Sequence, residues 1–455
     1  MHMDPETARM PVDNLPTPRI IPRKQHPISR KNIDREALKV LYRLRDAGHV
    51  AYLVGGGVRD LHQGKTPKDF DISTNARPGR LRKIFRNSRL IGRRFRLVQV
   101  FFPGNKIIEV STFRCRSEYD INGTASGDAD AVLAANNTFG TPSDDAFRRD
   151  LTINALFYSI ENHSIIDYVG GVKDLEDGII RMIGKPERRI TRDPARMMRV
   201  IRHAARNNFV IEPATWEAII AHRDKLMLCP ISRIRDELMR DLRSGDSCPW
   251  TKLALDSRLF EILFPFYAPA LQPSRNDDSR KLLLDIQASV DRLHKFGVPL
   301  PDQILLSLLL VPWALHEYDL LNKSCKGGDF HRLLRQVRGG LDEILGPMSI
   351  KKSHKENIAL QLVNLPQFTK FSKENSWPKW LKRKSYYKDC DLFFRIFCEA
   401  RDGKLVPHNI LAEATNRFTS AAKKPTRKRK HKKKSSHRGP AFDRKKQGGI
   451  FGLKQ

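Results

Sequence analysis

Two short stretches near the start of the chain decide its fold: LVGGGVRD, which is Leu53–Asp60, and KDFDIST, which is Lys68–Thr74. The first predicts a strand that ends in a glycine turn and continues into a helix. At such a turn the backbone N–H groups can approach a phosphate, and the dipole of the new helix favours the anion. Arg59, early in that helix, can add a forked pair of charged hydrogen bonds. The stretch therefore predicts a site for a phosphorylated ligand.

The second stretch carries two carboxylates. Asp69 and Asp71 alternate along a predicted strand, Asp69–Ser73, so both side chains would lie on one face and could hold a hard divalent cation. An isolated Asp-x-Asp pair is more often two solvated acids at a strand edge, and the nearby glycine turn is what favours the metal site. Glu109, on another predicted strand, is either a third metal ligand or a structural partner for an arginine, and its position leaves both roles open.

The pattern around these stretches predicts a small α/β head with a mixed sheet. Further strands are expected at residues 96–102 and 106–113, joined by a Pro-Gly-Asn turn, and residues 117–143 have the composition of a long loop. After Asp150 the pattern is helical, and amphipathic helices dominate the C-terminal two-thirds of the chain.

We accordingly divide the chain into five parts. Residues 1–34 are rich in proline and lone charges, without a helical or strand period, and are expected to form an extended arm. The arm precedes an α/β head, a helical neck, a helical body and a disordered tail. These parts span residues 35–175, 176–240, 241–415 and 416–455.

The charge of the chain indicates its partner. A formal net charge of +32 on 455 residues is typical of proteins that bind nucleic acid or an acidic membrane surface. Residues 421–455 contain fourteen Lys and Arg against one acid, a like-charge block expected to stay disordered until it meets a polyanion. The six cysteines form no CxxC pair, which favours a reducing, cytoplasmic location. We expect neither a membrane span nor a signal peptide.

Six motifs follow one another between Leu53 and Arg206: LVGGGVRD, KDFDIST, IIEVSTFR, RRDLTINAL, DYVGGVKDLEDGIIRMIG and DPARMMRVIRHAAR. Each alone is a modest signal. Together and in this order they resemble the successive motifs of the class II tRNA nucleotidyltransferase and bacterial poly(A) polymerase family. The resemblance implies an α/β nucleotidyltransferase head, which would be catalytic, followed by an all-α neck and body. The neck would recognise the nucleotide base, and the body would bind RNA.

The resemblance also implies a role for individual residues. Asp69 and Asp71 would hold two Mg²⁺ ions, with Glu109 as a further candidate ligand, and Asp150 would join them in catalysis. Asp193 and Arg196, three apart on one helical face, would read the base of ATP, and Asn154 would assist from the helix expected after Asp150. Arg192 replaces the acid that usually opens this last motif. The residues that would bind the nucleotide are Gly55, Gly56, Arg59, Arg149, Asp193, Arg196 and Arg199.

Within this family the sequence favours RNA polyadenylation. LIGRRFRLVQV, Leu90–Val100, resembles the segment that marks bacterial poly(A) polymerases, with Gln99 in place of the usual His, and the arm and basic tail resemble theirs too. The expected reaction is template-independent transfer of AMP from ATP to the 3′-hydroxyl of mRNA and small RNAs, by a monomer that could also contact the RNA-decay machinery. The alternatives are a CCA-adding tRNA nucleotidyltransferase and a non-catalytic RNA-binding protein; the latter would be expected to lack Asp69 or Asp71.

Two regions are candidates for RNA contacts outside the head. The first contains Trp377, Trp380, Tyr386 and Tyr387 interleaved with Lys and Arg. Proteins that bind single-stranded nucleic acid combine aromatic and cationic side chains in this way, but a core aromatic cluster with a basic rim explains the pattern equally well. The tail is the second candidate. Its proposed RNA-binding residues are Lys423, Lys424, Arg427, Lys428, Arg429, Lys430, Lys432, Lys433 and Lys434.

Overall fold

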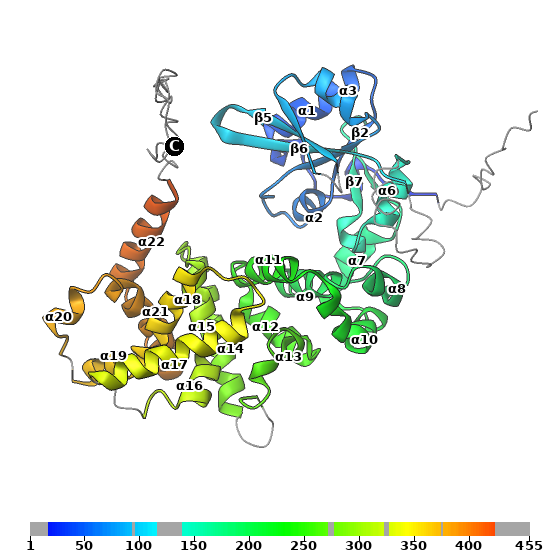
Figure 1. The fold of residues 1–455 in the computed structure, drawn as a ribbon. Helices are drawn as coiled ribbons and strands as arrows, with labels where there is room; N and C mark the ends of the chain where they lie inside the picture. The colour runs from blue at the N-terminus through cyan, green and yellow to red at the C-terminus, as the bar shows by residue number, and fades with distance from the viewer. Residues whose placement is uncertain are drawn as a thin grey trace, which may run out of the picture.

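The computed structural model describes residues 17–92, 96–115, 139–271, 277–322, 327–374 and 376–423. An α/β head lies at one end of the molecule, and a series of helices leads away from it to an all-α body (Figure 1). This arrangement confirms the predicted mixed α/β head followed by helices.

The head is built on one eight-stranded sheet with the order β1-β8-β7-β2-β3-β6-β5-β4. β3 and β6 pair in parallel, and the other neighbouring strands pair antiparallel, so the sheet is mixed as expected. The strands are β1 (Arg19–Ile21), β2 (Ala51–Val54), β3 (Asp71–Thr74), β4 (Ser88–Ile91), β5 (Leu97–Phe102), β6 (Lys106–Thr112), β7 (Leu156–Tyr158) and β8 (Ile165–Asp167).

Three helices pack with this sheet: α1 (Arg35–Asp46), α2 (Gly56–His62) and α3 (Pro78–Ile84). Asp34 caps α1 by accepting hydrogen bonds from the backbone N–H groups of Glu36 and Ala37. The apolar face of α1 is fully buried beside Leu53 and Ile72 of the two central strands. Because β2 and β3 are anchored by this core, the glycine turn after β2 and the carboxylate at the start of β3 occupy fixed positions.

Three further elements of the head flank its last two strands in sequence: α6 (Pro142–Arg148), the 3-10 turn η5 (Thr152–Asn154) and α7 (Gly171–Asp177). The neck follows and consists of α8 (Pro186–Arg192), α9 (Arg196–Asn207), α10 (Pro213–His222) and α11 (Ile231–Leu242), with β9 (Ile179–Ile180) and β10 (Val210–Ile211) as a small parallel pair. Apolar residues every three or four positions bury one face of α9, including Met197, Val200 and Ile201. The opposite, polar face of α9 is free to line a site toward the head.

The body consists of helices. They are α12 (Ser247–Asp256), α13 (Leu259–Leu263), α14 (Asp277–Lys295), α15 (Asp302–Leu309), α16 (Val311–Tyr318), α17 (Gly328–Leu345), α18 (Lys352–Val363), α19 (Leu365–Lys373), α20 (Lys379–Lys382), α21 (Tyr387–Asp402) and α22 (His408–Lys423). In the described part of the chain, none of the helices combines the length and apolar character needed to cross a membrane.

The structure corrects three local predictions. The arm is not a free extended segment throughout: Arg19–Ile21 form β1, which pairs with the distant β8 at the edge of the sheet, and 3-10 turns at Arg23–Gln25 and Arg30–Asn32 interrupt the extended backbone. Asp150 does not begin a helix: α6 ends at Arg148, and the chain continues through η5 into β7. The expected disordered tail begins too early, because α22 runs to Lys423. Most of the predicted 117–143 loop lies outside the described residues, as does the tail beyond Lys423.

Candidate active site

A cavity of about 610 Å³ lies where the glycine turn, the start of β3, the chain after α6 and the polar face of α9 meet. Six arginines and three aspartates are among its lining residues, so positive charge dominates a space large enough for a nucleotide. The lining residues are Gly55, Gly56, Arg59, Asp71, Arg148, Arg149, Asp150, Asn154, Asp193, Arg196, Arg199, His203 and Arg233. Most of the residues that we predicted for nucleotide binding and catalysis are therefore brought together.

The glycine turn has its conformation for steric reasons. Gly55 caps α2 with φ 71° and ψ −139°, a backbone conformation that other residues rarely adopt, and a Cβ on it would lie 3.1 Å from Nη1 of Arg149. A Cβ on Gly57 would lie 3.3 Å from the carbonyl oxygen of Asp69. The glycines thus let the turn approach both Arg149 and the segment that carries the carboxylates.

Arg59 is buried and held on several sides. Its guanidinium donates to Asp60 Oδ1 at 2.9 and 2.7 Å and to Oδ1 of Asn154 at 2.7 Å, and its Nη1 lies 3.2 Å from Nδ1 of His203. Asn154, which we expected on a helix, instead occupies η5. From there it joins α2 to α9 through these contacts, so Arg59 is oriented before any ligand binds.

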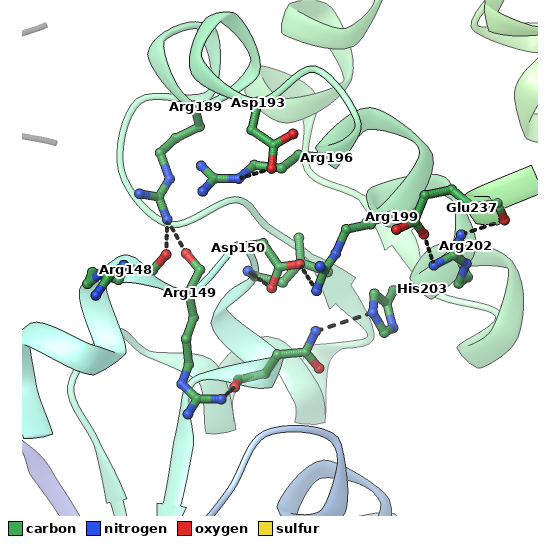
Figure 2. A network of polar contacts seen from close by, with 12 residues as sticks. Arg148, Arg149, Asp150, Arg189, Asp193, Arg196, Arg199, Arg202, His203 and Glu237 are labelled. Atoms are coloured by element: carbon green, nitrogen blue, oxygen red, sulfur yellow. Dashed lines mark hydrogen bonds and ion pairs between the residues drawn. The ribbon is translucent and has the colours of Figure 1, made fainter. Parts of the chain in front are cut away.

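Arg149 and Asp150 leave the end of α6 in opposite directions. Arg149 donates to Asp145 at 3.0 Å and to the carbonyl oxygen of Asn154 at 3.2 Å, which braces the chain beside the glycine turn. Asp150 pairs with Arg199 of α9 at 2.6 Å (Figure 2). Burial by itself would raise the pKa of Asp150, but the positive charge of Arg199 outweighs it and holds that pKa well below its usual range.

Asp71 begins β3, opposite Val54 on one side and Glu109 on the other. Solvent reaches its side chain through the cavity, yet the surrounding protein desolvates the carboxylate and, together with the nearby charge of Glu109, raises the pKa of Asp71 to about 6. Asp69 is not on the strand as we predicted, because β3 starts two residues later. Asp69 is exposed in the preceding loop, and it is absent from the lining of the cavity.

Glu109 has a partner that its sequence position did not reveal. Gln99, directly opposite on β5, donates a hydrogen bond from Nε2 to Oε1 of Glu109 at 2.9 Å. The expected arginine partner is not observed there. The carboxylate of Glu109 thus already accepts a hydrogen bond. The carboxylates of Asp69 and Asp71 have no hydrogen bond or ion pair within the described residues, so the two aspartates are the better candidates for metal ligands.

The donor set at the start of β3 fits Mg²⁺. No three His, Cys, Asp or Glu side chains gather into a ready metal site in the parts of the chain that the structure describes. Mg²⁺, however, is commonly held by one or two carboxylates together with the phosphates of a nucleotide, so a complete protein cage is not required. Desolvation and then the like charge of Glu109 raise the pKa of Asp71, and a dication would stabilise the charged carboxylate against both effects.

Asp193 and Arg196 do not share one helical face as predicted. Asp193 terminates α8, Pro194 follows, and Arg196 opens α9. The carboxylate of Asp193 accepts a hydrogen bond from Nη2 of Arg233 on α11 at 2.9 Å and forms an ion pair with its Nη1 at 2.8 Å, whereas Nε of Arg196 lies 3.8 Å away. The carboxylate of Asp193 is thus already paired with Arg233. The buried Nη1 of Arg196, by contrast, has no hydrogen-bond partner within the described residues.

Several residues of the site had not been predicted. His203 lies one turn after Arg199 on α9, and burial together with the charge of Arg59 lowers its pKa to about 3, so it is neutral near pH 7. Arg189 of α8 donates to the backbone carbonyl groups of Arg148 and Arg149 (Figure 2). His203 stands in a quoted motif and could have been found there, but nothing in the sequence connects Arg233 to Asp193.

Two other segments singled out in the sequence lie wholly or partly outside the described residues. Of the predicted RNA-binding tail, Lys423 ends α22, and the residues from Lys424 onward lie outside the described residues, as do Arg93–Phe95 of the LIGRRFRLVQV segment.

Comparison with known proteins places this geometry among enzymes. Residues 51–181 match the family model "Poly A polymerase head domain", and residues 208–271 match "Probable RNA and SrmB- binding site of polymerase A". The chain is 45% identical over 278 residues, 60% of each chain, to poly(A) polymerase I of Escherichia coli O6:H1. It is 50% identical to poly(A) polymerase I of Salmonella typhi, over 54% of this chain and 53% of the relative. The CCA-adding enzyme of Bacillus subtilis is 33% identical, over 51% and 56%.

Solved structures agree on the fold. A structure titled "The complex structure of CCA-adding enzyme with ATP" superposes with a TM-score of 0.56 at 17% identity, over 86% of this chain and 84% of that one. "Structure of tRNA-processing enzyme complex 3" gives 0.56 at 21% identity, over 85% and 92%. The sequence match to the poly(A) polymerases themselves covers about 60% of their length.

The class that this fold and cavity define is the nucleotidyltransferases: a glycine turn, an acidic strand start and a basic nucleotide-sized cavity between head and neck. Residues 51–181 belong to the poly(A) polymerase head-domain family, and over 54–60% of its length the chain is similar to bacterial poly(A) polymerases.

Proposed function

We propose that the protein is a polynucleotide adenylyltransferase that extends RNA 3′ ends with AMP from ATP and releases pyrophosphate. The observation that carries the proposal is the cavity between head and neck, in which six arginines line the same space as the glycine turn and Asp71 at the start of β3. The identity of 45–50% to poly(A) polymerases, against 33% to a CCA-adding enzyme, favours ATP as the repeated substrate. A cytoplasmic monomer that acts on mRNA and small RNAs, in contact with RNA-decay proteins, is consistent with this function.

The residues divide the work of binding the triphosphate. Gly55 forms the turn, with its own N–H bonded to the carbonyl oxygen of Leu156, and Gly56 presents its backbone N–H at the start of α2. Arg59 stands beside them in a fixed orientation. Asp150 forms an ion pair with Arg199 and would therefore act by positioning Arg199 toward the phosphates. Arg149 braces the turn from behind. Because these groups are fixed before ATP binds, little ordering of the protein is needed when the triphosphate arrives.

Base selection falls mainly to Arg196. Arg196 lines the cavity and its buried Nη1 lacks a partner among the described residues, so its guanidinium would be the group that donates to an acceptor on the edge of the base. Asp193, which we expected to read the base directly, would instead fix the shape of this wall through Arg233. A rigid wall suits a polymerase that adds a single kind of nucleotide repeatedly.

The chemical step would take place at Asp69 and Asp71. The 3′-hydroxyl oxygen of the RNA attacks the α-phosphorus of ATP, and the bond to the pyrophosphate breaks. Two Mg²⁺ ions held by Asp69 and Asp71 would lower the pKa of the attacking hydroxyl and neutralise the triphosphate. Asp71 at the strand start is anchored by the sheet, and it therefore fixes where the reacting groups meet.

A nucleotide-omission assay tests the function. The purified chain is given Mg²⁺ and an unstructured RNA primer with ATP alone or CTP alone, and in parallel a tRNA that lacks its 3′ CCA with both nucleotides. Long tails from ATP alone, with little product from CTP, are expected. Ordered addition of C, C and A to the tRNA, with no ATP-dependent tail on the primer, would instead identify a CCA-adding enzyme, and no incorporation at all would identify a non-catalytic RNA-binding protein.

A further inference from the structure

Three exposed aromatic side chains occur among the described residues, and one of them differs from the others. Phe139 and Phe296 each lie beneath an arginine, at 5.5 and 5.4 Å from guanidinium carbon to ring centre. Trp380 on α20 is 52% exposed and has no ring or cation contact within the described part of the chain. An open indole face on a surface is a stacking surface without a partner.

The residues around Trp380 are cationic and equally free. Lys379, Lys382, Arg383 and Lys384 are exposed, and in the described structure none of them forms a hydrogen bond or ion pair through its side chain. Between Ser376 and Lys388 the chain contains no acid. We call Trp380 and these four cations the α20 surface. Other basic residues of the body differ: Arg338 and Lys355, for example, both pair with Asp342.

The α20 surface is held rigidly although it projects outward. Leu381 is fully buried, and Trp377 packs edge-on against Phe368 with ring centres 5.3 Å apart and contacts Tyr387 at 6.2 Å. The two interpretations left open by the sequence therefore apply to different residues. Trp377, Tyr386 and Tyr387 pack against the aromatic core of the body, whereas Trp380 points away from it.

We propose that the α20 surface binds single-stranded RNA upstream of the 3′ end, with a base stacked on Trp380 and phosphates on the surrounding cations. The chemistry selects this partner, because an open aromatic ring in an acid-free cluster of unpaired cations matches a chain of bases and phosphates. Figure 1 places α20 at the outer edge of the body, away from the head, so only RNA long enough to reach it would be held there. The inference rests on the proposed function, since the RNA bound at the α20 surface would be the upstream part of the same RNA whose 3′ end receives AMP.

The test compares full-length variants on 5′-labelled, unstructured RNAs of graded length. Trp380→Ala is expected to weaken the binding of long RNAs about five- to tenfold by fluorescence anisotropy, to leave short primers unaffected, and to retain AMP transfer to short primers. Trp380→Phe should recover most of the affinity. The matched control is Phe296→Ala, an aromatic residue of similar exposure that lies beneath Arg292. Equal behaviour of Trp380→Ala and Phe296→Ala at every length would overturn the proposal.

Salt dependence tests the cations independently. Lys382→Gln with Lys384→Gln should make the slope of log affinity against log salt shallower by about 1.4, since each cation that binds a phosphate of a single strand contributes about 0.7. The control, Lys39→Gln with Lys173→Gln, removes the same charge from lysines that pair with acids on the head. An unchanged slope for the α20 pair would overturn the proposal. An altered sedimentation coefficient of the α20 variant with normal RNA affinity would also overturn the proposal, because it would assign the surface to self-association. Failure of the wild-type chain to add AMP to any primer would instead contradict the proposed function.

Discussion

At the scale of single residues, the partner of a carboxylate decides what it can still do. Asp71 and Glu109 lie side by side in the sheet, but Gln99 donates to Glu109 and no protein group binds Asp71 within the described residues. Asp71→Asn is therefore expected to reduce AMP transfer by a factor on the order of a thousand while RNA affinity stays unchanged. Glu109→Gln, the matched control, should lose far less activity. Equal losses in single-turnover assays would make Glu109 a third ligand.

The same reasoning separates Asp193 from Arg196. Arg196→Ala is expected to reduce the preference for ATP over GTP about ten- to a hundredfold, because a buried charged donor to the base is removed. Arg233→Met should also reduce the preference for ATP over GTP. Arg233 would not read the base itself, but its replacement would release Asp193. Values of kcat/KM for each nucleotide test both variants. Undiminished discrimination in Arg196→Ala would place base recognition elsewhere.

His203 gives the site a measurable pH signature. Its pKa is about 3 in the folded protein against 6.5 in the unfolded chain, because the site is desolvated and Arg59 lies close. Between pH 3 and 6.5 the unfolded chain therefore binds a proton that the folded protein does not, and stability falls as the pH falls through that window. From pH 7 to pH 5, the wild type should lose about 1–2 kcal/mol more than His203→Asn in urea unfolding. Parallel losses would contradict the low pKa.

At the scale of helices and strands, the sequence predicted most elements of the head and fewer of their ends. β5 and β6 alternate apolar and polar residues and flank a tight turn, so local pattern alone determines them. β1 has no such signal, because it is an edge strand that forms only by pairing with β8, far away in sequence. Asp69 precedes its strand, and α8 ends before Pro194, because tertiary packing and proline set those boundaries.

The site was predicted in the same uneven way. Residues within contiguous motifs, such as Arg59 and Asp150, could be assigned from the sequence and do line the cavity. The ion pair between Arg233 and Asp193 could not be predicted, because it joins two helices and neither sequence segment indicates how they pack together. Periodicity predicts that a face is polar. It does not specify which polar group on another element will pair with it.

Packing between α9 and α11 depends on a buried charge. Arg202 donates to Oε2 of Glu237 at 2.6 Å and also pairs with Asp241, and both acids are buried. Arg202→Met should lower the free energy of unfolding by about 3–5 kcal/mol, because two buried carboxylates lose their counter-charge. Arg240→Ala is the control: Arg240 bonds the same Glu237 but is 62% exposed, so a loss below about 1 kcal/mol is expected. Denaturant unfolding followed by circular dichroism compares the two, and similar losses would show that burial is not what matters.

At the scale of the whole molecule, the charge of the chain is divided between two tasks. The arginines of the cavity are held by acids and backbone groups and act on one nucleotide at a time. The basic block beyond α22 lies outside the described residues, and its composition alone suggests a different task, which is to raise the local concentration of RNA without reading its sequence. These two tasks should be separable by experiment.

Truncation after Lys423 leaves α22 intact and removes that block. RNA affinity should fall, and the slope of log affinity against log salt should become shallower by about 0.7 for each phosphate that the tail had neutralised. The rate of a single AMP transfer at saturating RNA should not change, because the described residues that line the cavity all precede the truncation point. A tail of the same composition in scrambled order should restore affinity and slope, since counterion release depends on charge and not on sequence. A scrambled tail that failed to restore them would mean that the tail recognises RNA through specific contacts.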